Sequence, residues 1–485
     1  MQNSINPRMG QAHAMAPDVL LGNAPHAQPP ARGLGPVRFF ALSFGCIVGS
    51  GWVVVLGDWL KSAGPLGVVL GMLAGGSVML ANSGAYGELI ARYPIAGGEF
   101  VFAQRIFGDR TAFFVGWLWT LSLLAVVAFE ATALPWVLET LIPAMKGPTL
   151  YLCLGTPVTA DGLAVGMGGT LLVAVMNYRG ARAAATLQSL LSFVFLGLAV
   201  AIISLGFALG SIANLDPLIA GDHAKPWWIG VFWIFATAPL FLNGFQSVAQ
   251  TVEERAGNVT FSRIAASMVF ALLVSIGFYC LVTLAAASAQ PWQALLDRPM
   301  ATAAAFETLL PHRALSLAVL VAAGFSIARV WNGVSIWVSR LLMAQARAGF
   351  LPAWLGIVDR RHGSPRYAVL FVAGCTALGV CLGKGAIIPL VDMASLCLAG
   401  NLVLACCAAL RARAIHGPDD AVYRTPGGVA TLTYALIGSA AMAVFAFIDP
   451  ILRRPGTIPI EWVTTGVWAA IGIVFWTLWQ KRRRQ

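Results

Sequence analysis

The chain has 485 residues, of which 58% are hydrophobic and 11% are charged, and its mean hydropathy is +0.78. Soluble domains usually carry about 25% charged residues, so this composition excludes a soluble protein and indicates an integral membrane protein. The net charge of +11 does not indicate nucleic-acid binding. The basic residues are scattered beside the ends of apolar segments, where they anchor membrane topology and contact anionic lipid.

The N-terminal segment, residues 1–35, is rich in Pro, Gly, Ala and His and lacks a continuous apolar stretch. A cleaved secretory signal needs such a stretch. We therefore predict a flexible cytoplasmic tail over residues 1–35.

Twelve apolar segments follow, and each is about as long as a helix that crosses a bilayer. They cover residues 37–60, 65–91, 111–139, 162–178, 186–210, 227–252, 261–288, 314–342, 367–383, 386–410, 430–449 and 461–480. The loops between them are short. The predicted fold class is an all-α membrane protein with 12 transmembrane helices.

An even number of spans places both termini on the same side of the membrane. That side carries most of the 31 Lys and Arg residues, including the basic end at 481–484. Because excess Lys and Arg mark the cytoplasmic face, we predict cytoplasmic termini and a multi-pass protein of the cell (inner) membrane.

Two of the segments are interrupted at mid-depth by glycine clusters. Residues 45–51 read Gly-Cys-Ile-Val-Gly-Ser-Gly, and residues 240–246 read Leu-Phe-Leu-Asn-Gly-Phe-Gln. Irregular backbone inside hydrocarbon leaves N–H and C=O groups without partners unless it lines a protected cavity. Broken helices at corresponding positions of two halves indicate a transporter's central site, although a Gly-x-x-x-Gly spacing also lets membrane helices pack closely.

The two ends of a broken helix attract opposite charges, because free N–H groups begin one half and free C=O groups end the other. The N–H groups near Ser50 and Gly51 suit a carboxylate, and the carbonyls near Ile47 and Val48 suit an ammonium group. An α-amino acid carries both groups. A polyamine or an amino alcohol, which remain the alternatives, uses only half of these contacts.

Four ordered motifs resemble the amino acid–polyamine–organocation family of transporters. They are residues 45–51, the acidic-to-aromatic run from Glu88 through Pro94-Ile95-Ala96-Gly97-Gly98 to Phe102 and Gly108, the sixth-span pattern Gly244-Phe245-Gln246 with Glu253-Glu254, and the eighth-span ending from Ser339-Arg340-Leu341-Leu342 to Pro352. The resemblance covers about residues 36–480.

The resemblance implies a LeuT-like fold of two inverted five-helix repeats, with the first helix of each repeat broken. The repeats cover residues 36–225 and 226–415, two further helices cover 416–480, and a basic cytoplasmic tail covers 481–485. It also implies the candidate substrate-binding residues, which are Ile47, Val48, Gly49, Ser50, Gly51, Leu240, Phe241, Asn243, Gly244 and Gln246, with Phe241 or Leu240 as an apolar lid.

One position departs from the family pattern. Family members commonly carry Glu or Asp where this chain has Gln246, and an amide neither titrates nor attracts a cation as a carboxylate does. We therefore expect no proton sensing at Gln246 and no specialisation for cationic amino acids.

Ionisable residues at membrane depth are costly and mark functional positions. Glu130 lies within the third segment and Arg329 near the middle of the eighth. They either pair and order the core, take part in proton or substrate coupling, or do not touch. The candidate coupling and gating residues are Glu130, Arg329, Asn332, Ser335 and Ser339. A guanidinium at Arg329 disfavours sodium as the coupling ion and leaves protons as the candidate.

The leading hypothesis is a secondary transporter that moves amino acids by alternating access, as a proton-coupled symporter or an exchanger. The chain has no catalytic or metal-binding motif, so we expect no enzyme activity, cofactor or metal. Its expected partners are the small solute, membrane lipids and, for coupling, protons. A non-transporting amino acid sensor or a channel is the alternative from another class.

Overall fold

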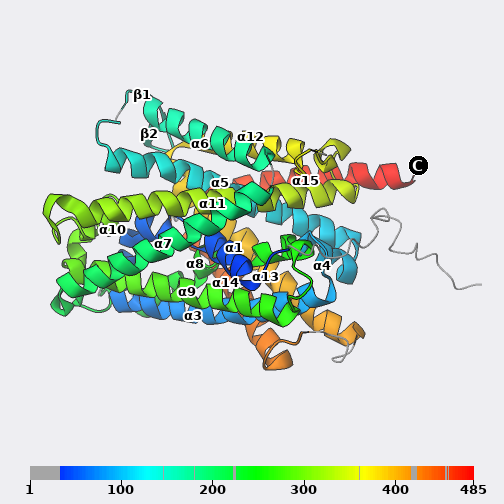
Figure 1. The fold of residues 1–485 in the computed structure, drawn as a ribbon, viewed down its shortest axis with the longest axis horizontal. Coiled ribbons are helices and arrows are strands. Elements are labelled where there is room, and N and C mark those ends of the chain that lie inside the picture. The colour runs from blue at the N-terminus through cyan, green and yellow to red at the C-terminus, as the bar shows by residue number, and fades with distance from the viewer. Residues whose placement is uncertain are drawn as a thin grey trace, which may run out of the picture.

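The computed structural model describes residues 33–145, 147–179, 181–221, 226–359, 361–416, 423–453, 456 and 458–484. The tail predicted over residues 1–35 therefore lies almost wholly outside the described residues. The polypeptide is a bundle of long helices with one small hairpin at one end (Figure 1).

The helices are α1 (Pro36–Ile47), α2 (Gly51–Val54), α3 (Leu56–Arg92), α4 (Gly98–Phe107), α5 (Asp109–Leu141), α6 (Ala160–Tyr178), α7 (Ala181–Leu209), α8 (Trp228–Phe241), α9 (Phe261–Ala289), α10 (Ala301–Ala305), α11 (Ala314–Arg347), α12 (Arg366–Leu382), α13 (Ile387–His416), α14 (Gly428–Arg453) and α15 (Ile460–Arg484). The strands β1 (Thr149–Cys153) and β2 (Thr156–Thr159) form an antiparallel hairpin. Among the short 3₁₀ helices, η3 (Phe245–Gln250) follows α8.

The predicted all-α membrane fold is confirmed. Within the described residues, 11 helical segments are long and apolar enough to cross a membrane, and the shorter apolar helix Arg366–Leu382 corresponds to the ninth predicted segment, residues 367–383. The hairpin and the short helix α4 were not predicted, because both lie in loops where apolar periodicity gives no signal. The last helix continues through Arg484 into the region predicted as a tail.

Two interruptions define the first span. Helix α1 ends at Ile47, α2 begins at Gly51, and α3 then continues the outer half of the span as far as Gly64. Gly64 has a φ of +69°, which a glycine adopts without strain. Pro65 follows it and has no backbone N–H to donate to the helical ladder. The bend at Gly64 therefore separates the first span from the second.

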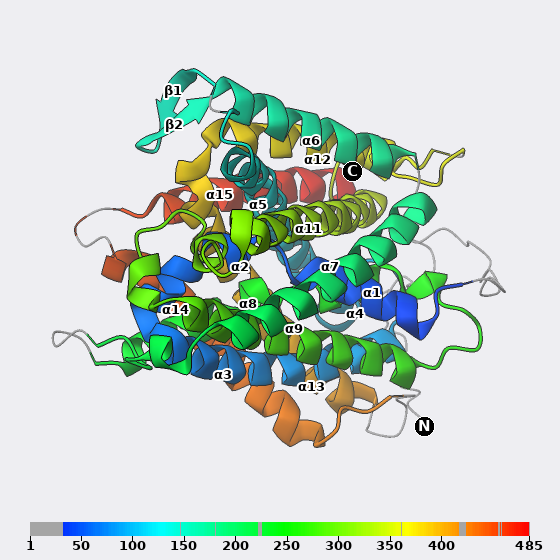
Figure 2. The same cartoon turned by 60° about the vertical axis from the view of Figure 1, so that its left-hand side comes forward.

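The bundle has two sides that enclose the interrupted helices. Helices α3, α8 and α9 pack together on one side, and α5, α6, α11 and α12 pack together on the other. Helix α1 lies between them, in contact with α7, α9 and α11 (Figure 2). In both views α6 and α12 lie along one edge, far from α3.

Candidate substrate-binding site

The amide at the start of α2 is bonded to a carboxylate from the opposite side of the bundle. The Ser50 N–H donates to Glu130 of α5, with its nitrogen 3.1 Å from Oε1 and 3.3 Å from Oε2. A Cβ at Gly49 would collide with the same carboxylate. Glycine at position 49 thus lets Glu130, which is buried, reach the N-terminal end of a half-helix, where a negative charge is stabilised.

The carbonyls on the other side of this break are bonded to α11. The Arg329 guanidinium donates to the Val48 carbonyl at 2.7 Å, and the Ser326 hydroxyl donates to the carbonyls of Val48 at 2.7 Å and Gly49 at 2.8 Å. Arg329 also stacks over the rings of Phe44 and Phe195, 4.7 and 4.0 Å from their centroids. Cation–π contacts of this kind stabilise a desolvated cation.

Glu130 and Arg329 therefore act on the same break from two sides, and the structure records no ion pair between them. Each charge contacts backbone polar groups that an unbroken helix would satisfy internally. Ser326 was not among the predicted residues. It lies about one turn before Arg329 on α11, and that spacing is the signal that would have identified it.

The second interruption lies directly after α8. Helix α8 ends at Phe241, and Gly244 has a φ of +138°. The Gln246 side chain turns back and accepts the Gly244 N–H through Oε1 at 2.9 Å, so Gln246 stabilises the turn. Asn243 is 4% exposed, and its Oδ1 has no hydrogen-bond partner among the described residues. A buried acceptor left without a donor costs about 1–3 kcal/mol and suits a donor on a ligand.

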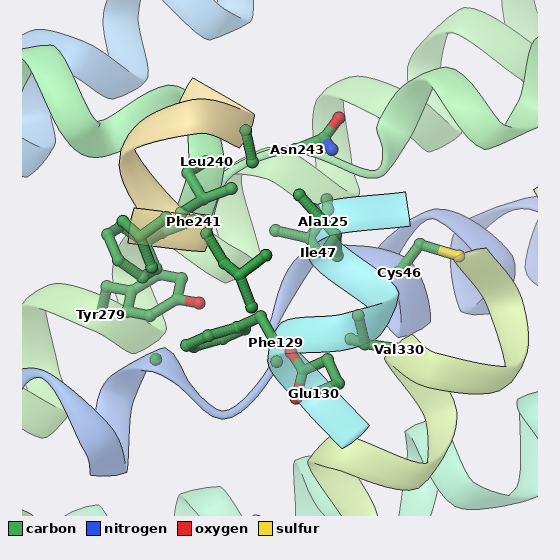
Figure 3. Close-up of a pocket in the computed structure, with 16 residues that line it drawn as sticks. Cys46, Ile47, Ala125, Phe129, Glu130, Leu240, Phe241, Asn243, Tyr279 and Val330 are labelled. Atoms are coloured by element: carbon green, nitrogen blue, oxygen red, sulfur yellow. The ribbon is translucent and has the colours of Figure 1, made fainter. Parts of the chain in front are cut away.

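A small cavity lies between the two interruptions. Six of the predicted binding residues line it: Ile47, Gly49, Gly51, Leu240, Phe241 and Asn243. Among the described residues of the lining, Glu130 is the one that is charged. The rest of the wall is largely apolar and comes from α1, α5, α9, α11 and α13: Cys46, Ala125, Val126, Phe129, Tyr279, Val330, Leu390, Val391 and Ala394. The ring centroids of Phe241 and Tyr279 are 6.2 Å apart. Figure 3 shows the two rings beside each other.

The remaining predicted residues lie outside this lining. Val48, Ser50, Gly244 and Gln246 form the backbone turns behind it. Asn332 donates to Gln188 and accepts from Asn177, both at 3.2 Å, and so links α6, α7 and α11. Ser335 lines a separate small cavity against α6 and α12, and the Ser339 hydroxyl donates to the Ile336 carbonyl within α11.

A wide vestibule lies on the hairpin side of the central cavity. Aromatic and acidic side chains line it, including Trp59, Trp233 and Asp58. Phe241 and Val391 line both spaces, so these two side chains separate the vestibule from the central cavity.

The opposite end of the bundle, which holds the start of α1 and the end of α15, is closed by polar contacts. The Glu253 carboxylate accepts the Ala96 N–H at 2.9 Å, and Arg340 donates to the Gln250 carbonyl at 3.2 Å. The Ala256 N–H donates to the Leu34 carbonyl at 3.1 Å. The central cavity therefore adjoins the vestibule on one side, and these contacts lie toward the opposite end.

Within the described part of the chain, no group of three or more His, Cys, Asp or Glu side chains is placed to hold a metal ion. The charged and polar groups at the cavity surround backbone ends, where they match a small zwitterion or amine.

Residues 34–478 match the model of a family described as amino acid permease. The chain is 27% identical over 468 residues to the branched-chain amino acid permease BcaP of Lactococcus lactis subsp. cremoris, an alignment that covers 92% of this chain and 94% of the relative. It is 25% identical over 456 residues to the Asc-type amino acid transporter 1 of Homo sapiens, covering 91% and 82%. It is also 23% identical over 461 residues to the methylthioribose transporter of Bacillus subtilis, covering 93% and 94%.

Proposed function

This chain belongs to the amino acid permease family, and from that membership we propose that it is a secondary carrier that moves amino acids across the cell membrane by alternating access. The observation that carries the proposal is the cavity between two interrupted helices. Glycines of the α1–α2 break, Glu130 and Asn243 meet there in an otherwise largely apolar wall. Transport, rather than catalysis, is the function that such a site performs.

The zwitterionic head of the solute binds at the interruptions. Its carboxylate takes the N–H groups at the start of α2, and its ammonium group binds Asn243 Oδ1. The Ser50 N–H is held by Glu130, so the solute carboxylate must displace the Glu130 carboxylate. Protonation of Glu130 removes the repulsion between the two carboxylates, and binding is therefore coupled to a proton.

The solute's side chain faces the apolar part of the wall. Ala125, Val126, Val330 and Leu390 offer no charged or hydrogen-bonding side-chain group. A buried charge without a partner is costly, so the cavity favours aliphatic side chains and rejects acidic and strongly cationic ones.

Sodium is not the coupling ion. Arg329 and Ser326 satisfy the carbonyls of Val48 and Gly49, which are the oxygen atoms that would otherwise bind a cation at this break. A fixed guanidinium at this position supplies the positive charge and repels a second cation.

The closed end faces the cytoplasm and the vestibule faces outward. The excess of Lys and Arg on the side of the termini supports this orientation. Release on the inside then requires that the contacts of Glu253 and Arg340 open while Phe241 and Val391 close the vestibule.

An amine without a carboxylate is the second candidate substrate, and one observation favours it. Among the described residues, Glu130 is the only charged one that lines the cavity, and a carboxylate that keeps its contact with Ser50 would attract an ammonium group without needing to be displaced. Polyamines and amino alcohols belong to this class.

Counterflow in proteoliposomes tests the proposal. Liposomes loaded with unlabelled leucine should accumulate external labelled leucine, because a carrier exchanges the two. Excess valine or isoleucine should compete, whereas glutamate, lysine and putrescine should not. Competition by putrescine or ethanolamine alone would favour the amine, and binding without counterflow would identify a sensor.

A further inference from the structure

Glu99 is a buried carboxylic acid at the closed end of the bundle, and nothing in the transport scheme above uses it. It lies at the start of α4, which connects the second and third spans, and it is 3% exposed. The Tyr86 hydroxyl donates to its Oε1 at 2.9 Å. Its Oε2 has no hydrogen-bond partner among the described residues.

The surroundings of Glu99 are neutral. A small cavity beside it is lined by Asn401 and by apolar side chains of α4, α5 and α13. The elements in contact with α4 are α5, α11, α13 and η3. These elements, together with α3 and α4 themselves, carry the following titratable groups at the central cavity or toward the closed end: Tyr86, Glu88, Arg92, Arg105, Asp109, Arg110, Glu130, Arg340, Arg347, Cys406, Cys407, Arg411, Arg413 and His416.

None of the cations in this set forms an ion pair with Glu99 in the structure. Arg413 donates to Glu88 at 2.7 Å, Arg340 donates to the Gln250 carbonyl, and Arg411 lies over the ring of Phe107. A carboxylate buried without a cation favours its neutral form. Burial accordingly raises the pKa of Glu99 to about 7, although the hydrogen bond from Tyr86 acts in the opposite direction.

Glu99 lies next to the segment that closes the cytoplasmic end. The backbone of Gly98 approaches the Gln250 side chain so closely that a Cβ there would lie 2.6 Å from Nε2. Both polar atoms of the Gln250 amide are buried without a hydrogen-bond partner among the described residues. Opening of η3 would admit water to Gln250 and expose α4 to the cytoplasm.

We propose that Glu99 is a proton-binding site that controls the cytoplasmic gate: the neutral acid fits the closed end, and loss of its proton favours opening. The inference rests on the proposed transport function for its direction and adds a second titrating position to Glu130. The two positions differ in effect. Glu130 acts on substrate binding in the central cavity, whereas Glu99 acts on the rate at which the inner end opens.

The sign of the pH dependence follows from the burial of the acid. A neutral Glu99 is compatible with the closed end, so the closed state carries no cost of burying a charge while the acid keeps its proton. As the pH rises through about 7, ionisation makes the closed state less favourable relative to the open, hydrated one. A single group with this pKa goes from roughly a tenth to roughly nine tenths ionised between pH 6 and 8, so the opening rate should rise about tenfold.

The experiment measures exchange of labelled for unlabelled leucine at saturating concentration, with the same pH on both sides of the proteoliposome, from pH 5.5 to 8.5. Wild type should speed up with a midpoint near 7. Glu99→Gln, which stays neutral, should keep the slow acid-side rate at every pH. Tyr86→Phe removes a donor that stabilises the ionised form, so it should move the midpoint to higher pH.

Glu139→Gln is the matched control, because Glu139 pairs with Lys384 near the hairpin, far from α4. It should keep the wild-type profile. A Glu99→Gln profile that follows wild type, or a Tyr86→Phe midpoint that moves to lower pH, would overturn the inference.

A second measurement separates this inference from the proposed function, because it requires no transport. Amide hydrogen exchange of residues 245–250, corrected for the intrinsic pH dependence of exchange, should increase through pH 7 in wild type and stay flat in Glu99→Gln. Equal protection of the segment at pH 6 and 8 in wild type would refute the switch even if leucine exchange is normal. If leucine exchange is absent but the amide hydrogen exchange of residues 245–250 still depends on pH, only the transport function is refuted.

Discussion

Gly51 is a residue at which the binding site has no room for a side chain. A Cβ at this position would collide with the ring of Phe241, and both residues line the central cavity. The backbone of α2 can therefore approach the lid and the solute only because glycine has no side chain.

Gly51→Leu should abolish leucine exchange, because the new side chain fills the place of the solute carboxylate and displaces Phe241. Extra carbons in a packed site typically cost about 1–3 kcal/mol, so the protein should still insert and elute as a single species. Gly168→Leu is the control, since Gly168 is exposed on α6 with no atom near its Cβ position. Normal exchange by Gly51→Leu would contradict the proposed site.

Glu130→Gln tests whether the central carboxylate exchanges a proton. A glutamine keeps an acceptor for the Ser50 N–H but cannot titrate, so the pH dependence of the KM for leucine should disappear. The measurement is initial uptake against leucine concentration at several pH values. If KM varies with pH as it does in wild type, Glu130 has no role in coupling.

At the scale of elements, the sequence predicts where two apolar segments are interrupted, but it does not predict which side chains contact the interruptions. Glycine clusters in apolar segments indicate a break, whereas the rotation of each helix about its axis decides which side chains reach it. Glu130 and Arg329 were recognised as intramembrane charges with three possible arrangements. The structure shows that each bonds the α1–α2 break, which required the actual packing of α5 and α11 around α1.

Glu99 illustrates the same limit in a loop. It lies between Gly98 and Phe102 in the acidic-to-aromatic run that begins at Glu88, and a carboxylate in a short loop is usually exposed. Only the packing of α4 against η3 and α13 buries it. An acidic residue followed by three apolar ones was the available signal, and it is too weak to predict burial.

The independence of transport from sodium is a prediction about the α1–α11 contact. Because Arg329 and Ser326 saturate the carbonyls of Val48 and Gly49, replacing sodium with N-methyl-D-glucamine should leave leucine uptake unchanged. A loss of uptake that sodium restores would show that the guanidinium does not take the place of the ion.

The junction between α3 and α13 is a buried ion pair that we expect to support the fold. Glu88 is 1% exposed and accepts from Arg413 at 2.8 and 2.7 Å and from the Thr425 hydroxyl at 3.0 Å. Removing one partner of a buried pair typically costs about 3–5 kcal/mol. Arg413→Met should therefore lower the melting temperature of the purified protein clearly, whereas Arg411→Met, at an exposed position of the same helix, should not. Equal melting temperatures would show that the pair is not structural.

At the scale of the whole molecule, the two ends of the bundle are in different states. A vestibule reaches Phe241 from one end, and hydrogen bonds of Glu253 and Arg340 close the other. Alternating access requires a second conformation in which these roles are reversed, with α1, α3, α8 and α9 moving against α5, α6, α11 and α12. The packing of the helices into these two groups supports a motion of this kind.

The most direct test of the central claim is a cryo-EM map of the protein with leucine. We predict density for the amino acid between residues 47–51 and 240–243, with its carboxylate at the start of α2, its ammonium group toward Asn243, and Glu130 withdrawn from the Ser50 amide. Leucine bound elsewhere, or two continuous helices with Glu130 unchanged, would contradict it.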